Sequence, residues 1–193
     1  LLLAIFRTLK SPVFFPLRVL SRGYVDLFRG LPLIIVLYLV GFGIPGLRLE
    51  FLGRIPPEVL GTIALALTYS AYVSEVFRAG IESVHPSQRL AARSLGLSYS
   101  KSMRLVVLPQ AVRKVVPPLM NDFVALQKDV GLISVLGAID AVRGAQIEAA
   151  KFANFTPYVV AGLLFVLLAI PTVRIADRIA RKFADREQMG STL

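Results

Sequence analysis

The chain has 193 residues, of which 55% are hydrophobic and 18% are charged, and its mean hydropathy is +0.69. An ordinary soluble domain is about 45–50% apolar and about 25% charged, and a soluble globule of this length has too little interior to hide the apolar excess. The same composition excludes a disordered chain. The sequence therefore indicates a membrane protein. It has no cysteine and one histidine, His85, so we expect no metal and no cofactor.

Apolar stretches of spanning length recur along the chain. A helix needs about 20 predominantly apolar residues to cross about 30 Å of hydrocarbon. Residues 31–47 and 152–173 carry no charge, and residues 55–74 carry only Glu58. We also expect residues 1–6 to be the end of a span that begins upstream. The expected spans are residues 1–6 (partial), 31–47, 55–76, 115–139 and 152–173.

The stretch 115–139 is apolar but interrupted by prolines and charges, among them Asp122, Lys128 and Asp129. Charged side chains inside a membrane are costly and are normally functional. We expect a membrane helix that breaks near Gly131 and shelters polar groups. Asp122 and Asp129 are seven residues apart, which places them almost on one helix face.

The distribution of basic residues predicts the orientation. Lys and Arg are in excess in residues 1–29, in residues 78–114 and in the tail from Arg174, whereas the loops near residues 48–57 (counted with Glu58) and 140–153 are balanced in charge. Cytoplasmic loops of membrane proteins carry such an excess. We therefore expect the basic segments and the C-terminus in the cytoplasm and the balanced loops outside. This pattern explains most of the net charge of +10 without a nucleic-acid partner.

Residues 41–46 match the dinucleotide pattern GxGxxG in form only. The pattern binds phosphate when a strand precedes it and a helix begins after it, but here it ends an uncharged span. We expect its glycines and Pro45 to shape an extracellular turn. The chain has no GxxxxGK[ST] motif, so we do not expect it to bind ATP itself.

The cytoplasmic segment 84–109 predicts two short helices. Pro86 suits the first position of a helix over residues 86–95, Gly96 suits a left-handed C-terminal cap, and a second helix can begin after Ser98. One interpretation is a solvated loop helix. The other is a docking helix that offers a soluble partner the apolar side chains of Leu90, Ala91 and Leu97.

The same segment resembles the EAA loop of ABC importer permeases. Leu90-Ala91-Ala92, then Gly96 after three residues, and the sequence Val106-Val107-Leu108-Pro109 after nine more fit its pattern. Leu90 stands where the family has glutamate. Further stretches look like the polar amino acid uptake branch, although Val130-Gly131 replace its usual Thr-Ser. These stretches are residues 28–33, 70–78, 95–98, 107–111, 117–119 and 126–129.

The resemblance implies an all-α, polytopic type I importer fold with about five membrane helices and a coupling helix, forming one permease domain over residues 1–193. Such a protein is not an enzyme. It would work in a bacterial inner membrane, surrounded by lipid, with two ABC ATPase subunits, a second identical or different permease and a periplasmic amino acid-binding protein. The ATPase-coupling positions would be Leu90, Ala91, Ala92, Gly96 and Leu97.

For transport of a polar amino acid (of the glutamate, glutamine or basic class), Asp122 would meet the substrate ammonium, and Lys128 or a helix end would meet its carboxylate. The resemblance implies substrate contacts at Asp122, Lys128 and Asp129 and near Ser70, Ala71 and Tyr72. An alternative is that Lys128 and Asp129 form structural ion pairs between helices. At the level of function, the alternatives are a secondary amino acid transporter, which usually shows internal repeats, and a structural membrane subunit.

Overall fold

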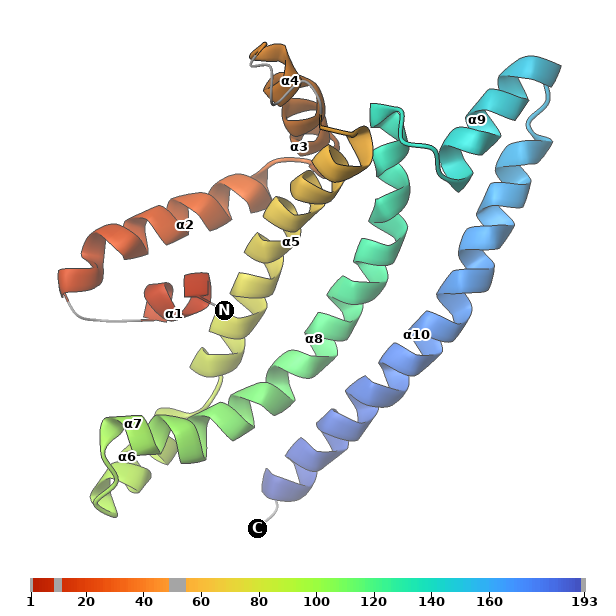
Figure 1. Ribbon diagram of the computed structural model, residues 1–193. Coiled ribbons are helices and arrows are strands. Elements are labelled where there is room, and N and C mark those ends of the chain that lie inside the picture. Colours follow the sequence, from red (N-terminus) through yellow and green to blue (C-terminus); the bar gives the residue numbers. More distant parts are fainter. Residues whose placement is uncertain (1, 9–11, 49–54, 192–193) are drawn as a thin grey trace. The chain divides into compact units, whose positions relative to one another are not determined.

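A computed structural model describes residues 2–8, 12–48 and 55–191, and these residues form helices and short connections with no strand (Figure 1). The expected all-α fold is confirmed. Of the residues used for the orientation, Lys10, Glu50 and Arg54 lie outside the described ranges, as does Leu1 of the first expected span. The elements are α1 (Leu2–Thr8), η1 (Pro12–Phe14), α2 (Phe15–Gly30), α3 (Leu33–Tyr38), η2 (Leu39–Gly43), α4 (Ile44–Gly46), α5 (Pro57–Glu82), α6 (Pro86–Ser94), α7 (Tyr99–Ser102), η3 (Met103–Val107), α8 (Leu108–Asp129), η4 (Val130–Leu136), α9 (Ala141–Phe152) and α10 (Thr156–Ser191).

The chain folds into two compact units that both combine distant parts of the sequence. Unit 1 comprises residues 1–25, 71–122 and 175–193, and unit 2 comprises residues 26–70 and 123–174. The helices α2, α5, α8 and α10 each contribute residues to both units. That all 193 residues act as one permease domain stays a prediction.

Two of the described helices are long and apolar enough to cross a membrane on their own: α5 and the part Thr156–Ala184 of α10. Two further pairs of consecutive helices reach this length and composition when each pair is taken as one span, namely Pro12–Gly30 with Leu33–Gly46 and Tyr99–Leu136 with Ala141–Phe152. The described residues thus offer two to four spans, in keeping with a multi-pass membrane protein.

The expected turn at residues 41–46 is wrong. The chain stays helical from Leu33 to Gly46, with a π-helical stretch over Leu39–Gly43, and Gly43 has an ordinary helical φ of −66°. The glycine at position 41 instead permits close packing, since a Cβ there would lie 2.3 Å from Cδ2 of Leu136. A π-bulge of this kind widens one turn of a helix.

The interrupted stretch 115–139 is helical as far as Leu136, although Pro117 and Pro118 lie inside it. The α-helix runs to Asp129 and tightens there into a 3₁₀-helix over Val130–Leu136, which ends at Gly137 with φ +92°. In place of the predicted break near Gly131, the helix changes from α to 3₁₀ at Val130. The positive φ of Gly137 explains why a glycine ends this segment.

The last expected span, residues 152–173, begins later and extends further than predicted. The long helix α10 starts at Thr156, where the side chain of Asn154 accepts hydrogen bonds from the Thr156 N–H (2.9 Å) and hydroxyl (2.8 Å). The preceding loop, expected over residues 140–153, contains the helix α9 from Ala141 to Phe152. Asp140 caps α9 by accepting the Arg143 N–H at 2.8 Å.

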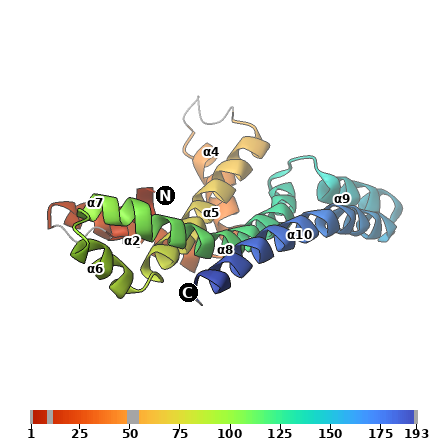
Figure 2. The ribbon, with the colours of Figure 1, turned by 90° about the horizontal axis from the view of Figure 1, so that it is seen from below.

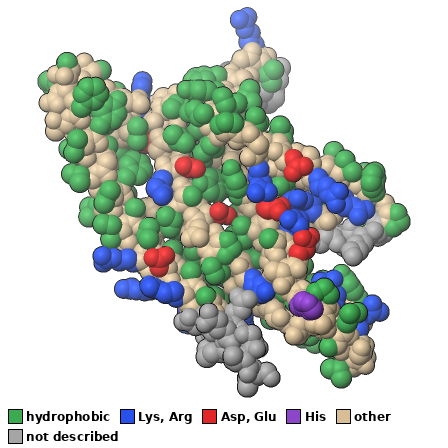
Figure 3. Space-filling model, turned by 180° about the vertical axis from the view of Figure 1, so that it is seen from behind, with side chains coloured by type: hydrophobic (Ala, Val, Ile, Leu, Met, Phe, Trp, Pro, Cys, Tyr) green, Lys and Arg blue, Asp and Glu red, His purple; other side chains and the backbone are tan. Residues whose placement is uncertain are grey.

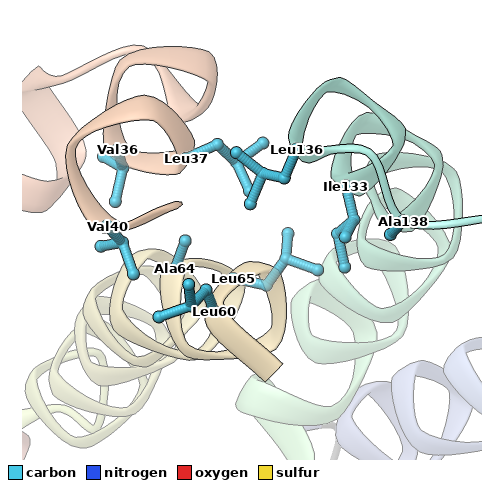
Figure 4. Packing of buried hydrophobic residues seen from close by; sticks show 9 residues of the cluster. All are labelled: Val36, Leu37, Val40, Leu60, Ala64, Leu65, Ile133, Leu136 and Ala138. Carbon is cyan, nitrogen blue, oxygen red and sulfur yellow. The ribbon is translucent and has the colours of Figure 1, made fainter. Parts of the chain in front are cut away.

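Unit 2 has a buried apolar core to which α3, η2, α5 and η4 contribute (Figure 4). The side chain of Leu37 points toward that of Leu136, and Ala64 and Leu65 come from α5 (Figure 4). Glycines let the backbones approach: a Cβ on Gly61 would lie 2.4 Å from Cγ2 of Ile133. The core therefore ties the 3₁₀ segment to the start of α5. Its members are Val36, Leu37, Val40, Leu60, Ala64, Leu65, Ile133, Leu136 and Ala138.

Apolar side chains also cover much of the outer surface, as the space-filling view shows (Figure 3). The part of α10 that is long and apolar enough to span a membrane is only 11% buried. A soluble protein rarely exposes apolar surface on this scale. The exposure agrees with the membrane class that the composition predicts.

Candidate functional site

The predicted two-helix segment after α5 is confirmed in unit 1, where α6 and α7 lie side by side (Figures 1 and 2). Pro86 is the first residue of α6. The ring of His85 caps this helix by accepting the Ser87 N–H at 3.3 Å. Ser98 caps α7 by accepting the Lys101 N–H at 3.4 Å. The role of His85 is thus that of a helix-flanking residue.

Gly96 ends α6 as predicted, with φ +80°. The Gly96 N–H donates to the Arg93 carbonyl at 3.0 Å, and the Leu97 N–H donates to the Ala92 carbonyl at 3.2 Å. These two bonds make a Schellman motif, which requires the left-handed residue between them. The motif fixes the direction in which the chain leaves α6.

The segment exposes large apolar side chains. Leu90 is 65% exposed and Leu95 is 84% exposed, and Ala91 is exposed as well. Ala92 is buried and Leu97 is half-buried, so these two residues support the segment from within. Leu95 was not expected on this surface from the sequence pattern. A segment that transmits movement to a partner needs an exposed face on a rigid support. Here Leu90, Ala91 and Leu95 are exposed, and Ala92 and Leu97 anchor the segment.

The segment η3, which contacts both α6 and α7, contributes to a small apolar core of unit 1. Val84, Val107 and Ala111 are buried together, with Ile81 and Met103 packed against them. The ammonium group of Lys114 also donates to the Ser83 carbonyl at 3.0 Å. The end of α5 and the start of α8 are therefore joined directly beneath α6 and α7.

Asp129, in unit 2, accepts a hydrogen bond from the Tyr69 hydroxyl at 2.8 Å. It forms no ion pair with Lys128 or with any other cation in the described parts of the chain. Lys128 is exposed and likewise makes no ion pair within these residues. Ion pairs that hold helices together, the alternative interpretation of Lys128 and Asp129, are thus not present here. The sequence did not single out Tyr69, because a tyrosine in an apolar helix does not indicate which residue its hydroxyl bonds to.

Asp122, in unit 1, is half-buried, and its Oδ2 is buried without a hydrogen-bond partner among the described residues. The same holds in unit 2 for Thr68 Oγ1 and Gln127 Oε1. Buried polar atoms are normally paired, and each exception asks for an explanation.

Ser70, Ala71 and Tyr72 are consecutive on α5, so their side chains point in three directions about 100° apart. The Ser70 hydroxyl donates to the Leu67 carbonyl at 2.9 Å, Ala71 is 0% exposed and Tyr72 is partly exposed. Because Ala71 is fully packed, its side chain is not open to a solute in this structure.

A charge network lies at the cytoplasmic end expected for α5, within unit 1. Arg7 of α1 donates to Glu75 at 2.7 Å, and Arg78 bridges Glu75 and Glu82. The sequence pattern did not reveal it, because Arg7 and Glu75 are 68 residues apart. The network ties α1 to α5, and each of the four charges has a partner of opposite sign.

Each unit has a groove among its described residues. The groove in unit 2, of about 520 Å³, lies along α9 and α10 and is lined mostly by small and apolar residues. The groove in unit 1, of about 460 Å³, is lined by Glu75, Lys114 and Pro117 among others. Neither contains Asp122 or Asp129. No group of three or more His, Asp or Glu side chains in the described residues lies close enough to hold a metal ion.

Comparison with known families gives one match over almost the whole chain. Residues 2–185 match the family described as "binding-protein-dependent transport system inner membrane component".

Curated relatives agree on the class of protein. The chain is 36% identical to the probable glutamine ABC transporter permease protein GlnM of Bacillus subtilis, over 84% of this chain and 74% of that protein. It is 35% identical to the arginine transport system permease protein ArtQ of Bacillus subtilis, over 92% and 80%. It is also 35% identical to the glutamate/aspartate import permease protein GltK of Escherichia coli, over 76% and 71%.

Solved structures show the same fold. The chain superposes on the crystal structure of an amino acid ABC transporter with histidines with a TM-score of 0.84 at 31% identity, covering 94% of this chain and 82% of that one. It also superposes on the MetNI methionine ABC transporter with a TM-score of 0.72 at 19% identity, which supports the fold alone.

The family implies that an ATPase and a substrate-binding protein are partners, so the chain is the membrane component and not the enzyme. The family match leaves no support for the two alternative functions, a secondary amino acid transporter and a structural membrane subunit. The chain belongs to the family of inner membrane components of binding-protein-dependent transport systems, as a multi-pass permease.

Proposed function

We propose that this chain is the permease subunit of an ABC importer that carries a polar amino acid of the glutamine, glutamate or basic class. The observation that carries this proposal is the collinear match, at 35–36% identity, to permeases named for glutamine, arginine and glutamate/aspartate. The structural match at TM-score 0.84 to an amino acid ABC transporter supports the same substrate class.

Substrate recognition is proposed at the polar residues of α8 and the middle of α5. An amino acid carries an ammonium and a carboxylate, so its path needs an anion and a cation. Asp122 and Asp129 supply carboxylates and Lys128 supplies an ammonium within the otherwise apolar stretch 115–139. The unpaired Oδ2 of Asp122 supports this assignment, because an unpaired buried acceptor costs about 1–3 kcal/mol. Ser70 and Tyr72 of α5 are included, whereas the side chain of Ala71 between them is packed in this structure.

Coupling is proposed at α6 and its Schellman turn. The exposed Leu90 and Ala91, supported by Ala92, Gly96 and Leu97, would dock on an ATPase subunit. Two ATPase subunits and a second permease, identical or different, would complete the transporter. Closure of the ATPases would move the two coupling segments as rigid bodies and change which side of the membrane the path opens to.

The proposed orientation has the C-terminus and the segment 78–114 in the cytoplasm and α9 outside. Its support is the excess of Lys and Arg in the segments assigned to the cytoplasm. An extracellular binding protein would then deliver substrate on the side of α9, and the ATPases would bind on the side of α6.

The test is uptake by the complete transporter. The permease, its ATPase and its binding protein are reconstituted in vesicles, and ATP-driven uptake of labelled glutamine, glutamate and arginine is measured in turn. We expect uptake of one of the three, stimulated by its binding protein. Uptake of none of them, with ATPase activity intact and stimulated by a different solute, would contradict the proposed substrate class.

A further inference from the structure

The helix α2, between the first two membrane segments, has two different faces. Leu17, Leu20, Tyr24 and Leu27 follow each other at spacings of three and four residues, so they form one apolar stripe on a helix. Arg18, Arg22 and Arg29 lie within an arc of about 40° on nearly the opposite side. The helix is therefore amphipathic, with its cations gathered on one face.

The described residues leave the leucines of the apolar stripe largely uncovered. Leu20 is 69% exposed and Leu27 is 54% exposed. The contact with the folded chain is made by a third face, on which Ser21 and Val25 are buried. Arg22 and Arg29 are exposed, and the guanidinium of Arg18 lies 6.0 Å from the centre of the Phe15 ring. The stripe thus needs an apolar environment that the described chain does not provide.

The direction of the chain after α2 suggests what that environment is. The chain turns by 106° at Leu31–Pro32, between the helix ending at Gly30 and the helical segment Leu33–Gly46. Residues 31–47 are uncharged and form a candidate span. If this segment crosses the bilayer, a helix at nearly a right angle to it lies along the membrane surface.

We propose that α2 lies flat on the cytoplasmic leaflet, with Leu17, Leu20 and Leu27 in the acyl-chain region and Arg18, Arg22 and Arg29 bound to anionic phospholipid headgroups. A helix that carries an apolar stripe on one face and its cations on another is typical of helices that lie in the membrane interface. Arginines near the cytoplasmic leaflet are attracted by its anionic lipids. A protein partner would account for the exposed leucines, but a basic face beside an apolar stripe favours an anionic lipid surface.

The position of α2 can be measured in the complete transporter. The chain has no cysteine, so Leu20→Cys and Asp26→Cys each accept a single spin label, with partner subunits that lack reactive cysteines. Asp26 is an exposed residue of the same helix outside the stripe. We expect the label at Leu20 to collide with oxygen, which concentrates among acyl chains, and the label at Asp26 with a water-soluble nickel chelate.

The role of the arginines is tested by lipid composition. Vesicles of phosphatidylcholine are compared with vesicles that also contain phosphatidylglycerol, and we expect the Leu20 label to lie deeper in the second. The variant Arg18→Gln/Arg22→Gln/Arg29→Gln should lose this response, because its affinity for anionic lipid falls at least about tenfold. The control Arg178→Gln/Arg181→Gln/Lys182→Gln removes three charges from α10 and should retain it.

Three results would overturn the inference. A Leu20 label open to the nickel chelate would place α2 in water. A label shielded from both reagents would place it under a protein partner. If the two triple variants respond equally to anionic lipid, the response is a general effect of the protein's charge and does not come from binding by α2. Uptake is recorded in the same vesicles, so that a failure of α2 to meet lipid is distinguished from a failure of transport.

Discussion

The hydroxyl of Tyr69 donates a 2.8 Å hydrogen bond to Oδ2 of Asp129, a residue 60 positions further along the chain. Asp129 is the last residue of α8, where the α-helix tightens into the 3₁₀ segment. Hydrogen bonds to an ionised acceptor are stronger than neutral ones. Tyr69 therefore orients a carboxylate at the point where the helix changes type.

Removing this donor tests its role. Tyr69→Phe keeps the ring and deletes the hydroxyl, so Asp129 loses a bond that contributes about 1.5–3 kcal/mol. We expect a lower melting temperature in detergent and an uptake KM raised several-fold with the ATPase rate unchanged. Tyr158→Phe, at a partly exposed tyrosine of α10, is the control and should alter neither. Wild-type KM in Tyr69→Phe would make the bond structural only.

Asp122 is tested by a change of charge at constant volume. Asp122→Asn removes the negative charge proposed to meet the substrate ammonium. We expect substrate-stimulated uptake to be abolished or redirected to another amino acid while basal ATPase activity persists, as measured in reconstituted vesicles. Normal uptake with the same amino acid preference and normal expression would leave Asp122 as a structural residue.

The Schellman turn at Gly96 is tested by two substitutions, one to a residue that disfavours the left-handed conformation and one to a residue that accepts it. Gly96 has φ +80°, which costs an ordinary side chain about 1–2 kcal/mol and a β-branched one more. Gly96→Val should therefore abolish stimulation of the ATPase by loaded binding protein while the permease still folds. Gly96→Asn should retain it, because asparagine accepts the left-handed conformation. Full coupling in the valine variant would show that the joint lies elsewhere.

The close approach of α5 and the 3₁₀ segment predicts contrasting effects of alanine at two glycines. At Gly61 a Cβ would lie 2.4 Å from Cγ2 and 3.1 Å from Cβ of Ile133, so Gly61→Ala should cost about 1–3 kcal/mol by overpacking. At Gly43 nothing lies within 4 Å, and Gly43→Ala should be neutral or stabilising by up to about 1 kcal/mol. Melting curves of the purified protein compare the two. Equal melting temperatures would contradict the packing described for unit 2.

The orientation is tested by labelling single cysteines in intact cells. Ser100 of α7 and Ala150 of α9 are both exposed. We expect Ala150→Cys to react with an impermeant thiol reagent added outside and Ser100→Cys to react only after the cells are permeabilised. The reverse pattern would invert the proposed topology.

Local chemistry made much of this protein predictable. The ends of α6, its caps at His85 and Gly96 and the start of α7 follow from residues within a few positions of each other. The membrane class follows from composition, since the bilayer demands long apolar helices. The family resemblance likewise rests on motifs that are read directly along the chain.

Which residues pack against or bond to each other depends on contacts between parts of the chain that are distant in sequence. The glycines at 41–46 signalled a turn, but Gly41 lies in a helix and faces Leu136. The pairing of Tyr69 with Asp129, and of Arg7 with Glu75, joins residues 60 and 68 positions apart. The sequence by itself determined the helices α6 and α7, their caps and the class of membrane protein, because those depend on composition and local hydrogen bonds. Only the tertiary structure decided which polar groups are paired and which, like Oδ2 of Asp122, have no hydrogen-bond partner among the described residues, because pairing depends on which helices pack together.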